Sequence, residues 1–151
     1  MNSTDNDFAV ELAPWNVRVC EQVRPVRESV FVREQNVPLE LEWDGLDEQC
    51  VHAIAVASDG TVIGTARMLP DGHIGRMAVV PGWRRRGVGS ALLRALLAEA
   101  WRRGIAKPYL HAQVHAVGFY EGHGFHAVGD VFMDAGIPHL EMVTTRKPDR
   151  S

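Results

Sequence analysis

Cysteine, excess positive charge and long apolar runs are all scarce in this sequence of 151 residues. Its two cysteines, Cys20 and Cys50, are too few for a disulfide framework and lack the spacing of metal ligands. We interpret both as reduced packing residues. The histidines show no ligand spacing either, so the sequence predicts no metal site.

The charge balance argues against an extended nucleic-acid surface. Lys and Arg number 16 against 19 for Asp and Glu, a formal net charge of −3, whereas nucleic-acid-binding domains usually carry a basic excess. No apolar run approaches the length of a membrane span, and the polar start MNSTDND has no signal-peptide core. We therefore expect a cytoplasmic protein with neither a nucleic-acid nor a membrane partner.

The length predicts a single domain over residues 1–151. Hydrophobic residues make up 46% and charged residues 23% of the chain, which is typical of a globular protein with a real core. Polar residues and Pro148 predict short flexible ends at about 1–6 and 147–151.

One strand–turn–helix unit organises the rest of the chain. His73–Val80 predicts a strand, which ends at Pro81 and Gly82 because proline cannot donate to a sheet and glycine permits a turn. A long helix should begin near Gly87 and end before Gly104, which suits the position after a helix. Its apolar side chains have helical spacing: Leu92, Leu93, Leu96, Leu97, Ala100 and Trp101.

The turn in this unit suits a phosphate group. Unpaired N–H groups at a helix N-terminus bind anions, and Gly87 and Gly89 would let a bulky anion reach the backbone. Arg84, Arg85 and Arg86 add positive charge beside it. The alternative is a solvated arginine run with two turn glycines.

Two common phosphate loops do not fit this turn. Gly82 and Gly87 have the outer spacing of a Walker loop, which then needs Lys followed by Ser or Thr. Val88 and Gly89 stand there instead. A dinucleotide fingerprint would need a third glycine at Leu92.

The remaining segments predict a mixed, mostly antiparallel sheet. Asp-Gly turns at 59–60 and 71–72 indicate a meander before the long helix. The strand after that helix should run parallel to its predecessor, because a helical crossover joins the two. Shorter helices are expected from Pro25 to Pro38 and from Ala116 to Gly124. The other expected strands are Trp15–Val23, His52–Ala57, Thr61–Leu69, Pro108–Gln113, Phe125–Asp134 and Ile137–Thr145.

The segment Leu39–Gln49 is acidic and surrounds Trp43. It is interpreted either as a solvated loop or as an acidic lip that attracts a cationic amine. Its carboxylates are Glu40, Glu42, Asp44, Asp47 and Glu48.

The motif Arg84-x-x-Gly87-x-Gly89, preceded by Met77-Ala78-Val79-Val80-Pro81, resembles the coenzyme A pyrophosphate loop of the GCN5-related N-acetyltransferase (GNAT) family. A second signature, Gln-x-x-Ala-x-x-Phe-Tyr-x-x-x-Gly-Phe over Gln113–Phe125, resembles the strand and helix that follow the family's long helix. Segments 30–38, 110–113 and 136–142 are similar to the ElaA-like branch. The resemblance implies an α/β (α+β) domain with the GNAT fold, a mixed sheet of six to seven strands and about four helices.

The resemblance also implies where acetyl-CoA binds and which group is the acid. Tyr120 takes the position of the family's general acid, and a main-chain N–H near Val79 that of the oxyanion donor. Packing of Tyr120 beside Phe119 is the alternative. Gln113 stands where the family frequently has Asn. The residues expected to contact acetyl-CoA are Met77, Ala78, Val79, Arg84, Arg85, Arg86, Gly87, Val88, Gly89, Ser90 and Gln113.

The resemblance fixes no general base. We favour Glu34 and His139 as catalytic residues, because both lie in motifs shared with the ElaA-like branch. His115 and His123 are interpreted as structural. The further candidates are Glu40, Glu42, Asp44, His52 and His111.

The implied reaction is direct transfer of acetyl from acetyl-CoA to a primary amine of a small molecule or of a peptide or protein. An amine with a pKa of roughly 10.4 must first lose its proton, which costs roughly 4–5 kcal/mol at pH 7. The first alternative is a non-catalytic acyl-CoA-binding or regulatory module, and the second is an interaction domain. A homodimer through an exposed strand on the C-terminal side of the sheet is a further prediction.

Overall fold

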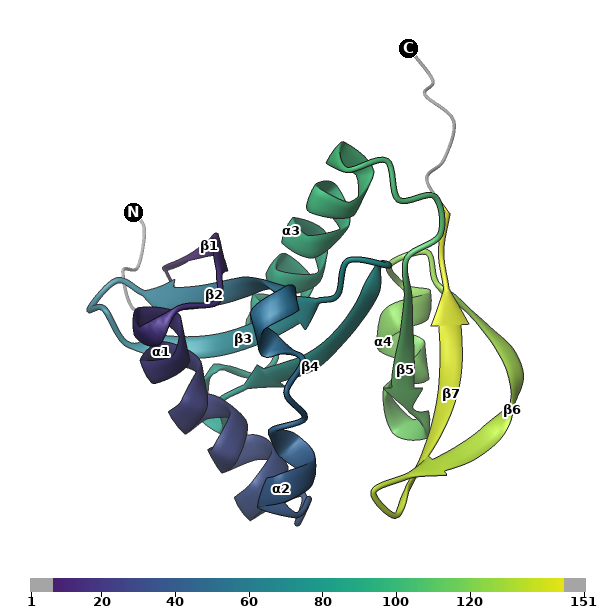
Figure 1. Ribbon diagram of the computed structural model, residues 1–151, viewed down its shortest axis with the longest axis horizontal. Helices are drawn as coiled ribbons and strands as arrows, with labels where there is room; N and C mark the ends of the chain where they lie inside the picture. Colours follow the sequence, from purple (N-terminus) through teal and green to yellow (C-terminus); the bar gives the residue numbers. More distant parts are fainter. Residues whose placement is uncertain (1–6, 146–151) are drawn as a thin grey trace.

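A seven-stranded sheet in the order β1-β2-β3-β4-β5-β7-β6 forms the centre of the molecule (Figure 1). The computed structural model describes residues 7–145, so the predicted flexible ends, 1–6 and 147–151, lie outside the described residues. The strands are β1 (Phe8–Pro14), β2 (Val51–Ala57), β3 (Val62–Met68), β4 (His73–Val79), β5 (Tyr109–Gln113), β6 (His126–Asp134) and β7 (Ile137–Val143). The main helical segments are α1 (Val17–Arg27), the π-helix η2 (Glu28–Glu34), α2 (Leu39–Glu42), α3 (Val88–Arg102) and α4 (Val117–Glu121).

The sheet confirms the predicted fold class. Strands β1 to β4 form an antiparallel meander, and β4 and β5 form the parallel pair that a crossover through α3 requires. Strand β7 lies between β5 and β6 and runs antiparallel to both. Strand β6 is therefore an exposed edge, and a homodimer through it stays a prediction.

The first predicted strand, Trp15–Val23, is wrong. Strand β1 ends at Pro14, and Asn16 then caps α1, its side-chain oxygen accepting a hydrogen bond from the Val19 N–H at 2.8 Å. Val19, Val23 and Val26 recur at intervals of three and four and are all buried, as one face of a helix requires. The spacing of these valines indicates a helix, although their β-branched chemistry favours a strand.

The helix expected to begin at Pro25 is misplaced as well. Pro25 lies inside α1, and the chain continues into the π-helix η2. The Gln35 N–H donates to the Val30 carbonyl at 3.1 Å, five residues back.

Helices α1 and α3 cover opposite faces of the meander (Figure 1). Leu92, Leu93 and Leu96 of α3 pack with Ala53 and other alternate residues of β2 in the largest core. On the other face, Val19 and Val23 of α1 pack on Ile54. The core therefore has two layers, which cover the central strands on both faces.

Strands β4 and β5 pair only at their beginnings and then separate. The two pairs are His73 with Tyr109 and Ile74 with Leu110. Beyond them the register between β3 and β4 shifts at a bulge, where Arg76 has a φ of 50°. A bulge bends and twists its strand, so β4 turns away from β5 and leaves a gap between their carboxyl ends (Figure 1).

Candidate active site

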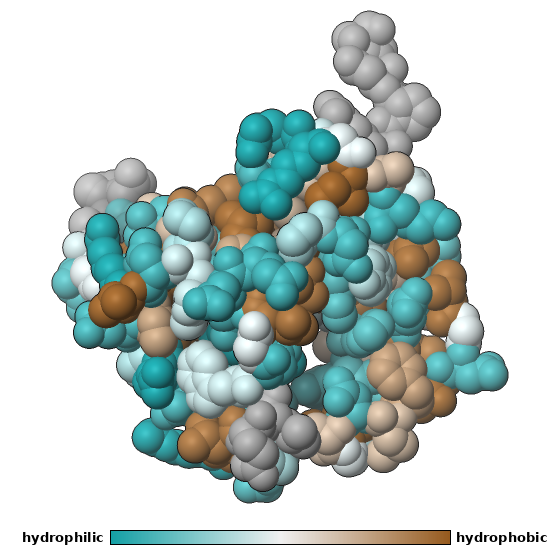
Figure 2. All heavy atoms as spheres, viewed as in Figure 1, coloured by the Kyte–Doolittle hydropathy of each residue, from teal (hydrophilic) through white to brown (hydrophobic). Residues whose placement is uncertain are grey.

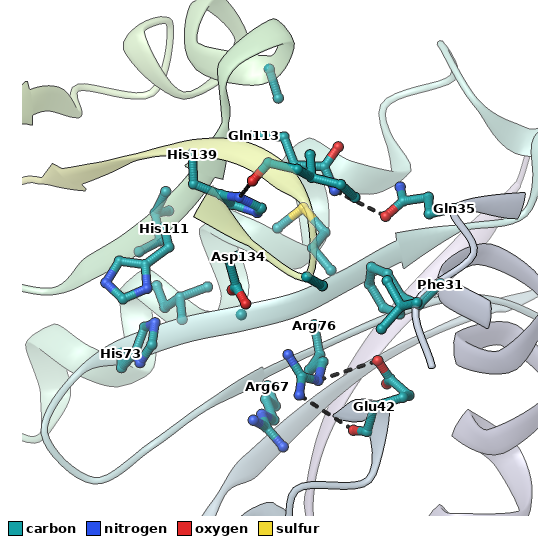
Figure 3. A pocket seen from close by; sticks show the side chains of 18 of the residues that line it. Phe31, Gln35, Glu42, Arg67, His73, Arg76, His111, Gln113, Asp134 and His139 are labelled. Atoms are coloured by element: carbon teal, nitrogen blue, oxygen red, sulfur yellow. Dashed lines mark hydrogen bonds and ion pairs between the residues drawn. The ribbon is translucent and has the colours of Figure 1, made fainter. Parts of the chain in front are cut away.

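A cavity of about 320 Å³ lies in the gap between β4 and β5. Residues of η2, β4, β5, α4 and the β6–β7 hairpin line it. Figure 3 shows Phe31 and Gln35 across the cavity from His111 and His139. In the space-filling view, hydrophilic side chains cover most of the visible face (Figure 2). The cavity therefore lies between the part of the molecule that carries α1 and the part that carries β5, β6 and β7.

The predicted acid, Tyr120, is held at this cavity by α4. Its ring packs edge-on against Phe119 and Phe125, with centroid distances of 5.0 and 6.1 Å. Its hydroxyl lies 3.9 Å from the Met77 sulfur of β4. Burial raises the pKa of Tyr120 to about 12, so the phenol is fully protonated at neutral pH and can donate a proton.

The predicted base, His139, lies on β7 and lines the same cavity. Its Nδ1 is 2.7 Å from the carbonyl oxygen of Ile137. A carbonyl oxygen can only accept a hydrogen bond, so Nδ1 carries the proton. In the neutral ring Nε2 is therefore unprotonated and can take up a proton.

The second predicted base, Glu34, forms a two-pronged ion pair with Arg84. The carboxylate oxygens accept from Nη1 and Nη2 of Arg84 at 2.8 and 2.7 Å. Hydrogen bonding from Arg84 lowers the pKa of Glu34, which makes this carboxylate a weaker base. The same guanidinium also donates from Nε to the Val79 carbonyl at 2.9 Å.

The predicted pyrophosphate loop leads directly into α3. Gly87, the N-cap, has a φ of 85°, a conformation that side chains disfavour and glycine adopts easily. The side chain of Val88 is buried in the core, so only its backbone can contact a ligand. Around this turn, Arg86 lies over the Trp83 ring at 4.9 Å, and Arg85 has a φ of 65°.

The other predicted contacts lie along β4 and at the end of β5. Ala78 is buried against Val26 and Val30, so it also offers only its backbone. Gln113, the last residue of β5, donates from Nε2 to Oε1 of Gln35 at 2.9 Å (Figure 3).

Phe119 and His123 are neighbours of the loop that the sequence does not assign to the site. Ser90, in the first turn of α3, has its Oγ 2.9 Å from Nε2 of His123, a residue expected to be only structural. A side chain added at Gly89 would stand 3.5 Å from the Phe119 ring. Phe119 and His123 are four residues apart, a helical spacing, and their rings lie 5.0 Å from each other. That spacing is the sequence signal that could have found them.

Three carboxylates of the acidic segment, those of Glu42, Asp44 and Asp47, are neither solvated freely nor open to an amine, because arginines pair with them. Arg67 forms ion pairs with Asp44 at 2.6 Å and with Asp47 at 2.9 Å. Arg27 forms an ion pair with Asp47 at 2.8 Å. Arg76 contacts Asp44 at 3.1 Å and Glu42 at 3.4 Å. The side chain of Glu40 lies outside the described residues. The cluster therefore contains three positive and three negative groups, which are Arg27, Arg67, Arg76, Glu42, Asp44 and Asp47.

The two other histidine candidates differ in position. His52 is buried, packs at a tilt against the Trp15 ring at a centroid distance of 4.8 Å and has Nε2 3.0 Å from the Asp47 carbonyl oxygen. It does not line the cavity. Burial lowers the pKa of His52. His111 lines the cavity, next to His73 at a centroid distance of 4.6 Å.

Residues 7–145 contain neither a metal-binding cluster nor a membrane-spanning helix. No cluster of three or more His, Cys, Asp or Glu side chains there has the arrangement of a metal site. No helix in this part of the chain is long and apolar enough to cross a membrane.

A family model described as an acetyltransferase (GNAT) domain matches residues 21–146. The match covers most of the chain, and the protein belongs to the GNAT acetyltransferase family. This confirms the predicted family and identifies the class of protein as an acyltransferase.

Among its relatives is the uncharacterized N-acetyltransferase YjcF of Bacillus subtilis, 39% identical over 121 residues, which are 78% of this chain and 86% of YjcF. Protein ElaA of Escherichia coli is 34% identical over 125 residues, 78% of this chain and 81% of ElaA. Its crystal structure superposes with a TM-score of 0.81 over 91% of this chain and 99% of ElaA. An acyl-CoA N-acyltransferase from Pseudomonas aeruginosa is 29% identical, with a TM-score of 0.81 over 92% of this chain and all of that one.

The charge cluster predicts a specific loss of stability in acid. Burial alone would raise the pKa of Asp44, but hydrogen bonds from Arg67 and the Leu46 N–H outweigh it and lower the pKa to about 2 from 3.8. A depressed pKa stabilises the fold above the unfolded value, and this stabilisation disappears as the pH falls towards the folded value. The free energy of unfolding should therefore fall between pH 3.8 and about 2, and less steeply in Asp44→Asn.

Urea unfolding at several pH values measures this slope. Asp130→Asn, which removes an exposed carboxylate of β6, is the matched control and should keep the wild-type slope. Equal acid slopes in Asp44→Asn and the wild type would contradict the assigned role of Asp44.

Proposed function

We propose that this protein transfers acetyl from acetyl-CoA directly to a primary amine of a small molecule or of a peptide or protein. The observation that carries the proposal is that Tyr120 and His139 line one cavity in the gap between β4 and β5. This gap lies next to the glycine-rich start of α3. A proton donor, a proton acceptor and an anion-binding turn are thus available to one substrate pair.

Acetyl-CoA would lie along β4, with its pyrophosphate at the N-terminus of α3. The N–H groups of Val88, Gly89 and Ser90 are in the first turn of that helix, where backbone donors and the helix dipole favour an anion. Arg85 and Arg86 add positive charge to the same turn. The edge of β4 that faces the gap would offer the backbone of 77–79 to the thioester arm.

The acceptor amine would enter from the side of η2 and β7. His139 can take its proton at Nε2, because Nδ1 is held in its protonated form by the Ile137 carbonyl. Deprotonation exposes the nitrogen lone pair, which is needed to attack the thioester carbon.

Attack forms a C–N bond and puts negative charge on the thioester oxygen. The N–H of Val79 lies on the edge of β4 and would donate to this oxygen. Collapse of the intermediate restores the C=O bond and breaks the C–S bond, and Tyr120 gives its proton to the departing sulfur. The nitrogen, now an amide, releases its remaining excess proton, which restores the Tyr120 phenol. The high pKa of Tyr120 keeps that proton in place until a thiolate forms.

The ion pairs of the acidic segment affect which acceptor amine the cavity can select. Three of its carboxylates, those of Glu42, Asp44 and Asp47, are paired with arginines, so these three groups do not select amines by a net negative charge. A cavity of about 320 Å³ suits a small molecule or one extended side chain. Shape and hydrogen bonding should therefore determine which amine is accepted.

Replacement of Tyr120 by Phe tests the acid. The variant keeps the ring contacts with Phe119 and Phe125, so the fold and the affinity for acetyl-CoA should stay near wild type. Loss of the donor should lower kcat by roughly 10²–10⁴-fold. Thiol release measures kcat, and calorimetric titration measures the affinity. An unchanged kcat would remove Tyr120 from this role.

Replacement of His139 by Gln tests the base. The amide side chain of His139→Gln cannot take up the proton of the amine, so kcat should fall by roughly 10²–10⁴-fold in a thiol-release assay. His115→Gln, which changes another cavity histidine, is the matched control. A wild-type kcat in His139→Gln would assign the base to a different group.

A further inference from the structure

The end of η2 bridges the two separated strands. Glu34, its last residue, is bound to Arg84, which follows β4. Gln35, the next residue, accepts a hydrogen bond from Gln113 at the end of β5. We call Glu34 and Gln35 together the strap, because consecutive residues hold the carboxyl ends of β4 and β5 across the gap.

Through Arg84, the strap also contacts the backbone of Val79, whose carbonyl and N–H groups face the gap. The Val80 N–H donates to the Ile63 carbonyl of β3 at 2.9 Å. The carbonyl of Val79 belongs to the same trans peptide, so it points the opposite way, into the gap. Nε of Arg84 donates a hydrogen bond to this carbonyl oxygen at 2.9 Å. An extended residue directs its own N–H and carbonyl to the same side, so the Val79 N–H also faces the gap.

We propose that Glu34 is a positioning residue rather than a base. Its carboxylate holds Arg84 in its hydrogen bond with the Val79 carbonyl, and this contact keeps the Val79 N–H directed at the thioester oxygen. Gln35, through Gln113, keeps the end of β5 at a fixed distance from the end of β4. The proposal rests on the proposed acetyl transfer and assigns Glu34 a role through Arg84, without contact with either substrate.

Three observations favour this role over proton transfer. Both carboxylate oxygens of Glu34 are occupied by Arg84. Among the described residues that line the cavity, Gln35 is present and Glu34 is not. The Glu34 and Arg84 side chains are 43% and 38% exposed, so the pair adds little to global stability and its function is local.

A double-mutant cycle on kcat tests the strap, with Glu34→Gln, Arg84→Gln and the double variant. Each single change should lower kcat by roughly 10–100-fold, the effect of a misplaced reacting group, and the double variant should lose no more than the worse single variant. The pH profile of Glu34→Gln should keep both limbs. Glu34→Asp, which keeps a carboxylate for Arg84, should lose less of the rate than Glu34→Gln.

Two further variants keep the test decisive. Gln113→Leu cuts the other half of the strap and should also lower kcat without a change in the pH profile. Glu99→Gln is the matched control, because it breaks a two-pronged pair with Arg102 at the far end of α3 and should leave kcat unchanged.

Opposite results identify which claim fails. Loss of the acid limb in Glu34→Gln, with effects that add to those of Arg84→Gln, would make Glu34 the base and overturn the strap. Wild-type kcat in Glu34→Gln and Gln113→Leu would also overturn it. Failure of the wild-type protein to bind acetyl-CoA in a calorimetric titration would instead overturn the proposed function itself.

Discussion

The separation of β4 from β5 is the constraint on which the rest of the structure depends. The two strands share only two paired residues each before the bulge at Arg76 turns β4 away. A non-glycine residue with a φ of 50° is strained, by about 1–3 kcal/mol, and persists only where its surroundings hold it. Arg76 is held through its ion pairs with Glu42 and Asp44.

The charge cluster therefore has a structural role in the site. It attaches the segment that follows η2 to β3 and β4, and it does so with equal numbers of positive and negative groups. Buried charges are tolerated only when they are paired and hydrogen-bonded. Pairing also removes the net charge that an acidic wall would have offered to an amine. The same contacts thus shape the cavity and set its electrostatics.

Segments with local signals could be predicted from the sequence. Helix α3 follows from the leucines at helical spacing and from Gly104, whose φ of 79° ends the helix. The Gly104 and Ile105 N–H groups close this end on the Trp101 and Ala100 carbonyls at 3.1 and 3.0 Å. The glycine turn before α3 and the meander from β2 to β4 follow from equally local chemistry.

Features that depend on distant partners could not be predicted in this way. Gly75, next to Arg76, is a local sign of a bulge, but the partners that hold Arg76 lie more than thirty residues earlier. In the sequence the carboxylate of Glu34 resembles a free base, because Arg84, 50 residues later, is not visible as its partner. The valines of α1 suggest a strand because their chemistry masks the helical spacing and the Asn16 cap.

Selective binding of acetyl-CoA tests most directly the claim that the separated strands hold a thioester substrate. Thermal unfolding would be followed while the protein is titrated with acetyl-CoA, and with ATP and NAD as controls that carry a pyrophosphate but no thioester arm. At 100 times its dissociation constant, a ligand of the folded state adds about 2.7 kcal/mol of stability. The account predicts a rise of the melting temperature with acetyl-CoA that neither control reproduces at equal concentration. No rise with acetyl-CoA, or equal rises with all three ligands, would contradict it.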